Sequence, residues 1–140
     1  ELNTDQQEKA HGVLLSAAAY VPGTLDEYDD LLREEVKSGG NTVEQARVLG
    51  DALEYAERYD AAVTLYEAAA RVHEDKGEFS YRRARLLIEI IEDEDEGVSQ
   101  LVRAVSQGFD DRKRLQALLQ QVDVEVPEAL QELPDNQENQ

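Results

Sequence analysis

Apolar residues recur three and four positions apart along almost the whole chain, and no stretch alternates with the two-residue period of a strand. This pattern predicts an all-α protein with about seven helices. We expect the helices at residues 5–20, 24–36, 42–57, 59–72, 78–92 and 97–107, followed by one from residue 110 or 111 to 121. Pro127 then opens one last short turn, because proline is well suited to the first helical position.

Residues that end and begin helices lie between the predicted segments. Gly39-Gly40 is expected to end the second helix, because glycine accepts the left-handed conformation of a helix end at little cost. Thr42 and Gln45 form a capping-box pattern at the start of the third helix. Breaks of only a few residues between long helices require neighbouring helices to pack antiparallel. That arrangement fits either a helical bundle or a solenoid.

The segment from residue 49 to 70 resembles the tetratricopeptide repeat. Gly50 and Ala62 would let the two helices of a pair cross closely, and Tyr66 would fill the space beside them. The matching residues are Leu49, Gly50, Leu53, Tyr59, Ala62, Tyr66, Ala69 and Ala70, and the spacing returns at Tyr81, Ala84, Ile88, Gly97, Leu101, Ala104 and Val105. Recurrence matters because one helix pair cannot bury its apolar face alone and needs a neighbour.

The resemblance implies a right-handed superhelical array of antiparallel helix pairs within one domain at 1–134. This domain would hold a degenerate pair at 1–40, a clear repeat at 41–75, a second repeat at 76–109, and a capping helix with the end of the domain at 110–134. Residues 135–140 are polar and expected to be disordered. Arg85 departs from the family, which keeps a small residue there, and Glu94 stands where the first repeat has Tyr59. A plain helical bundle is the alternative.

Charge narrows the range of partners. The chain has 14 basic and 32 acidic side chains, for a net charge of −18. Such a protein repels nucleic acid and anionic membrane surfaces, and no apolar run approaches the ~20 residues of a membrane span. The acidity fits attraction of a basic partner, a solvated surface or adaptation to high salt.

Cysteine and methionine are both absent. The lack of cysteine excludes disulfides, thiolate metal sites and thiol nucleophiles. The lack of an initiator methionine indicates a processed product. This composition favours an exported protein in a bacterial periplasm, with the cytoplasm as the alternative.

Motifs for catalysis are weak, and we expect neither an enzyme nor a cofactor. His11 and His73 are the only histidines and lie on separate predicted helices, and no glycine-rich phosphate loop precedes a helix. The acidic run 92–96 before Gly97 is similar to a calcium loop. Its closing ligand would fall on Arg103, however, which cannot coordinate a cation. We therefore interpret the acids as residues favoured by the dipole of a helix start, and expect no metal site.

The resemblance also implies a binding surface, because in this family the first helix of each pair lines a concave groove. The groove positions carried onto this chain are Glu44, Arg47, Asp51, Glu54, Tyr55, Phe79, Arg82, Leu86 and Glu89. The family's carboxylate clamp for chaperone tails is not recognisable at these positions. We expect an adaptor that binds a peptide or helix of mixed charge from another protein. The alternative is a structural subunit that self-associates into a homo-oligomer through the ends of its array.

Overall fold

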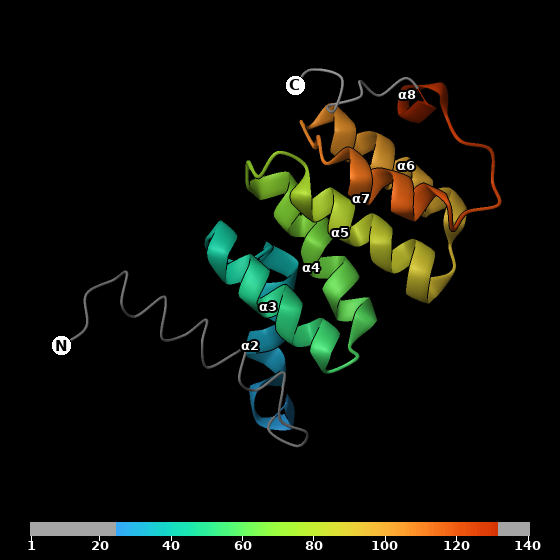
Figure 1. The fold of residues 1–140 in the computed structure, drawn as a ribbon. Coiled ribbons are helices and arrows are strands. Elements are labelled where there is room, and N and C mark those ends of the chain that lie inside the picture. Colours follow the sequence, from blue (N-terminus) through green and yellow to red (C-terminus); the bar gives the residue numbers. More distant parts are fainter. Residues whose placement is uncertain (1–24, 132–140) are drawn as a thin grey trace. The chain divides into compact units, whose positions relative to one another are not determined.

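The computed structural model describes residues 25–131, with side chains from Leu32 onward, and the predicted helix at 5–20 and the tail at 135–140 lie outside this range. All regular structure within it is helical, which confirms the all-α prediction (Figure 1). The elements are α2 (Leu25–Ser38), α3 (Val43–Tyr55), α4 (Tyr59–Val72), α5 (Glu78–Leu86), the π-helical turn η1 (Leu87–Ile91), α6 (Glu94–Ser106), α7 (Arg112–Leu119) and α8 (Glu128–Gln131). The chain divides into two compact units, and the boundary in the sequence lies between Glu74 and Asp75.

In the first unit, α2 and α3 both pack against α4. The helix α4 has the bounds that the sequence predicts. Thr42 caps α3 as expected, because its side-chain oxygen accepts the backbone N–H of Gln45 at 3.1 Å. The buried residues of α3 are Ala46, Leu49, Gly50, Ala52 and Leu53.

The turn between α2 and α3 lies directly on α4. Gly39 and Gly40 have φ angles of +85° and +79°, which confirms the predicted left-handed helix end. A Cβ atom on Gly39 would come within 2.6 Å of the backbone nitrogen of Ala69, so only glycine fits there. At the end of α4, Nε2 of His73 lies 3.1 Å and 3.2 Å from the carbonyl oxygens of Gly39 and Gly40. Carbonyl oxygens only accept hydrogen bonds, so Nε2 is the protonated ring nitrogen and donates a hydrogen bond to them.

Two helix pairs in the chain have matching spacing. The first residues of α3 and α5, Val43 and Glu78, are 35 residues apart. The first residues of α4 and α6, Tyr59 and Glu94, are also 35 residues apart. In the first pair, a Cβ on Gly50 of α3 would come within 2.5 Å of the Tyr66 ring on α4. In the second pair the roles are exchanged, because a Cβ on Gly97 of α6 would come within 2.5 Å of Ile88 on η1. Each pair therefore crosses closely through one glycine and one large side chain.

The second pair differs from the sequence prediction at its connection. The predicted helix 78–92 is α-helical only to Leu86 and continues as the π-turn η1, after which Glu92 takes a left-handed φ of +64°. Helix α6 begins at Glu94, three residues before the predicted start. The side chain of Asp93 accepts the N–H of Glu96 at 3.3 Å, so the acidic run forms the cap and first turn of the helix.

Helix α7 completes the core of the second unit. Asp111 caps it by accepting the N–H of Arg114 at 3.2 Å. Leu115 and Leu118 are buried in a cluster that includes Leu101 of α6 and Leu130 of α8. Together these contacts give α5, α6, α7 and α8 one shared hydrophobic core.

Candidate protein-binding surfaces

One face of α3 is exposed over its whole length. Glu44, Val48, Asp51 and Tyr55 are all exposed and follow one another at spacings of four, three and four residues, which places them on one side of the helix. We call these four residues the α3 outer face. Tyr55 is 76% exposed, the largest exposure among the large apolar side chains of the described residues. Three of the predicted groove residues therefore lie together on an exposed surface.

Two further groove residues of α3 lie at the edges of this face. Arg47 is partly exposed, and its Nη1 lies 3.7 Å from a carboxylate oxygen of Glu44. Glu54 accepts a hydrogen bond of 2.5 Å from the hydroxyl of Tyr66, so its carboxylate also holds the side chain that packs on Gly50. Glu54 thus has a structural role that its sequence position did not reveal.

Of the four predicted groove residues in the second pair, two are buried, one is partly buried and one is exposed. Phe79 and Leu86 are both 0% exposed, so the expectation that they line an open groove is wrong. They are apolar and seven residues apart, which places them on the same buried side of the helix. Arg82 is mostly buried, and its Nε lies 3.3 Å from a carboxylate oxygen of Glu78. Glu89 is exposed.

Glu78 also has a partner outside α5, Arg114, which the sequence pattern does not predict. Arg114 of α7 makes two parallel hydrogen bonds to the Glu78 carboxylate, at 2.9 Å and 2.8 Å. The same guanidinium lies 4.3 Å above the ring centroid of Tyr81, which stacks on Phe109 with ring centroids 4.6 Å apart. This cluster joins α7 to α5, and its members are too far apart in sequence for a local pattern to pair them.

Burial and the neighbouring positive charges have opposite effects on the pKa of Glu78. Burial raises the pKa of Glu78, but the hydrogen bonds and positive charge of Arg114, together with Arg82, outweigh it and hold the pKa below its ordinary value. The hydrogen bond to Glu78 raises the pKa of Arg114. Burial also raises the pKa of Tyr81. Glu78 is therefore an ionised acceptor that fixes Arg114, and the cluster is structural.

The positive charges of Arg82 and Arg83 on α5 are both paired with glutamates. Arg82 pairs with Glu78, and Nη1 of Arg83 lies 3.4 Å from a carboxylate oxygen of Glu96 on α6. Arg82 thus pairs within its own helix, whereas Arg83 pairs across to the next. The α3 outer face is consequently a clearer candidate surface than the side of α5.

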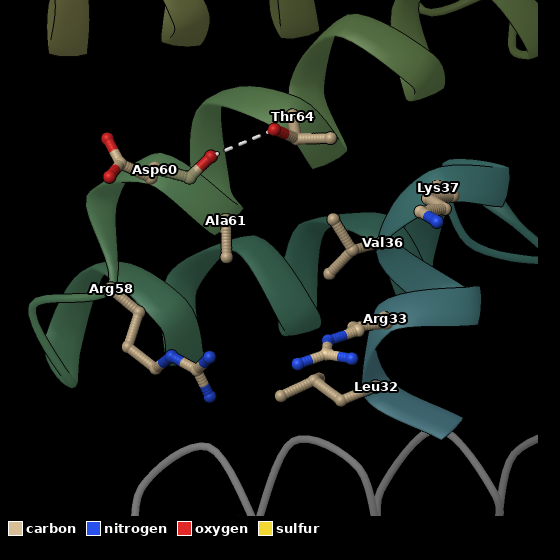
Figure 2. Close-up of a pocket in the computed structure, with 8 residues that line it drawn as sticks. All are labelled: Leu32, Arg33, Val36, Lys37, Arg58, Asp60, Ala61 and Thr64. Atoms are coloured by element: carbon tan, nitrogen blue, oxygen red, sulfur yellow. Dashed lines mark hydrogen bonds between the residues drawn. The ribbon is translucent and has the colours of Figure 1, made fainter. Parts of the chain in front are cut away.

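A second candidate lies between α2 and α4, where the first unit has a cavity of about 320 Å³ (Figure 2). We call it the α2–α4 pocket. Its lining combines apolar side chains with three cations, and comprises Leu32, Arg33, Val36, Lys37, Arg58, Asp60, Ala61 and Thr64. The sequence does not predict this grouping of cations, because Arg58 is far along the chain from Arg33 and Lys37 on α2.

Metal sites and membrane spans are absent from the part of the chain that the structure describes, residues 25–131. In this range no three histidine, aspartate or glutamate residues are grouped so as to hold a metal ion. None of the helices described is both long and apolar enough to cross a membrane. Comparison with protein-family models, with curated proteins and with solved structures found no match. Inference of function therefore rests on the two surfaces described above.

Proposed function

We propose that this chain is a non-catalytic protein-interaction module built as an array of tetratricopeptide-like helix pairs. Two features support this architecture: the helix starts recur after 35 residues, and each pair crosses closely at one glycine. Helices repeated in this way create extended surfaces for other proteins rather than enclosed sites for chemistry.

The single observation that carries the binding proposal is the exposure of Tyr55 at 76% on the α3 outer face. Tyrosine is enriched among the residues that dominate binding energies, because it contributes a large rigid area with a polar tip. Val48, one helical turn away on the same face, is also exposed and extends the apolar area. A partner that covers both side chains would remove this area from water.

The charges of the same face indicate the chemistry of the partner. Glu44 and Asp51 flank Val48 on the α3 outer face and are exposed. We infer that the partner is a peptide or helix that places apolar side chains on Val48 and Tyr55, and basic side chains beside the two carboxylates. Arg47 at the edge pairs with Glu44, but its side chain is 43% exposed, more than that of Arg82 or Arg83, so it admits an acidic residue as well and the partner segment carries charges of both signs.

Self-association is the second candidate. Ile90 and Ile91 at the η1 turn are 45% and 39% exposed, and two neighbouring isoleucines on a surface can serve as a contact between copies. Light scattering over a range of protein concentrations distinguishes the two functions. A strictly monomeric species at high concentration contradicts the structural-subunit alternative.

Capture of partners from a lysate of the source organism tests the proposal. The immobilised protein is compared with Tyr55→Ala and with Val72→Ala, which truncates another exposed apolar side chain, 59% exposed, on a different helix of the same unit. We expect the wild type and Val72→Ala to retain the same proteins and Tyr55→Ala to lose them. Equal retention by all three proteins contradicts a site at the α3 outer face.

A further inference from the structure

The α2–α4 pocket gathers positive charge in a strongly acidic chain. Three of its eight lining residues are Arg33, Lys37 and Arg58, and one is acidic, although acids outnumber bases 32 to 14 in the sequence. In Figure 2 the guanidinium groups of Arg33 and Arg58 point into the space between the helices from opposite sides. The carboxylate of Asp60 points away from that space. The local charge of the pocket is therefore opposite to the net charge of the protein.

Two of these cations are not neutralised by the part of the chain that the structure describes. Arg47, Arg82, Arg83 and Arg114 each pair with a glutamate, whereas Lys37 and Arg58 form no ion pair with any described acid. Arg33 has an interaction of its own, so the charge open to a ligand is counted on Lys37 and Arg58 alone. Two cations beside one cavity favour a ligand that carries carboxylates.

The interior of the pocket is apolar. Leu32 and Val36 of α2 are buried at 2% and 6% exposure, and Ala61 of α4 lies opposite them (Figure 2). The volume of about 320 Å³ is at the lower end of the range for ligand pockets, ~300–1,000 Å³. A cavity of this size accommodates one or two side chains rather than a large cofactor. Its ligand must therefore combine a compact apolar group with negative charge.

We propose that the α2–α4 pocket binds an acidic segment of a partner protein. The segment inserts one aliphatic or aromatic side chain against Leu32, Val36 and Ala61, and its flanking carboxylates lie beside Lys37 and Arg58. This site differs from the α3 outer face in its helices and in its charge preference, since that face is acidic. Either site can fail without the other.

The test uses NMR titration of the full chain with three capped pentapeptides. The first is acetyl-Glu-Glu-Leu-Glu-Glu-amide, the second has serine in place of leucine, and the third has lysine in place of all four glutamates. We expect the first peptide to shift the amide signals of Leu32, Val36 and Ala61 selectively. The serine peptide should bind several-fold more weakly. The lysine peptide should leave these signals in place, although the net charge of −18 attracts it to the protein as a whole.

Variants with matched charge assign the site. Lys37→Gln and Arg58→Gln should each weaken the leucine peptide about fivefold. Lys113→Gln makes the same change of charge at an exposed residue of α7 in the other unit and should have little effect. Ala61→Leu fills the cavity and should remove the preference for leucine over serine. Circular dichroism of each variant confirms that the helices are retained.

Several results overturn the proposal. Equal weakening by Lys37→Gln and Lys113→Gln would show that net charge, not the pocket, governs binding. Equal affinity for the leucine and serine peptides would show that the cavity is not filled. The absence of any shift at the pocket excludes an acidic segment as its ligand. If the same signals shift when the protein is concentrated without any peptide, the pocket binds a second copy of the chain.

Discussion

The ring of Tyr66 on α4 packs on the backbone of Gly50 on α3, so closely that a Cβ atom at residue 50 would lie 2.5 Å from the ring carbon Cε1 and from the hydroxyl oxygen. The hydroxyl is held in place by a hydrogen bond of 2.5 Å to Glu54 on α3. The tyrosine therefore cannot swing away without losing this bond. This contact fixes the distance between the two helices of the first pair.

Gly50→Ala should destabilise the protein for this reason. In an exposed helix interior, the same change stabilises by about 1 kcal/mol, but overpacking a buried contact costs typically 1–3 kcal/mol. We expect the packing cost to exceed the gain in helix propensity, and urea unfolding measures the net effect. In a Tyr66→Ala background the obstacle is gone, so Gly50→Ala should become stabilising there. A stabilising effect in both backgrounds contradicts the close crossing.

His73→Ala should weaken the junction between α4 and the α2–α3 turn. The substitution removes the donor that lies 3.1 Å and 3.2 Å from the carbonyl oxygens of Gly39 and Gly40. We expect a loss of about 1 kcal/mol in the free energy of unfolding, a typical value for a hydrogen bond. Val72→Ala, next to it but exposed, serves as the control. Equal effects of the two substitutions would show that the histidine contact does not contribute.

Glu78→Gln should destabilise the protein at neutral pH and less so in acid. The carboxylate receives two hydrogen bonds from Arg114 and one from Arg82, and its loss should cost about 1–2 kcal/mol at pH 7. The pKa of Glu78 is lower in the folded protein than its ordinary value of 4.5. The stabilisation is thus complete above about pH 4.5 and disappears as the pH falls through the folded pKa.

Unfolding of Glu78→Gln and the wild type at several pH values measures this difference. The difference in free energy of unfolding between the two proteins should be constant near neutral pH. It should disappear as the pH falls below 4.5. Glu125→Gln, at an exposed residue of the same unit, is the control and should show little effect at any pH. A gap that persists in strong acid would mean that Glu78→Gln acts through packing and not through charge.

Salt should stabilise the protein. The net charge of −18 opposes compaction, and ~0.5 M NaCl screens repulsion between exposed carboxylates, so the melting temperature should rise. A triple variant, Glu34→Gln, Glu125→Gln and Glu128→Gln, removes three exposed charges and should show a smaller rise. A fall in melting temperature on adding salt would show that attractive ion pairs outweigh the repulsion.

The sequence predicts most of the helices because their signals are local. Helix α4 has its predicted bounds, and Thr42 is the cap that the capping-box pattern indicates. The predicted start of α6 at Gly97 is too late, because the acidic residues before Gly97 form the first turn of the helix after the Asp93 cap. The π-turn η1 could not be predicted, since a continuous apolar stretch has the same composition in either helix type.

The candidate sites depended on information that a sequence does not hold. The resemblance to the repeat family places Phe79 and Leu86 in a groove. Their apolar character and seven-residue spacing indicate burial instead, and both are buried. The pairing of Glu78 with Arg114 joins two helices, and the α2–α4 pocket places Lys37 of α2 and Arg58, which precedes α4, beside one cavity. Such pairs follow from tertiary packing, which periodicity and capping do not specify.

Photocrosslinking from residue 55 tests the central claim, that the α3 outer face binds another protein. A photoreactive phenylalanine derivative, which keeps the aromatic ring, replaces Tyr55 in one protein and Val72 in the other, and both are irradiated in a lysate of the source organism. We predict a specific adduct from residue 55, with the partner segment carrying apolar and basic residues, and no such adduct from residue 72. Adducts from residue 72 alone, or identical adducts from both residues, would contradict the claim.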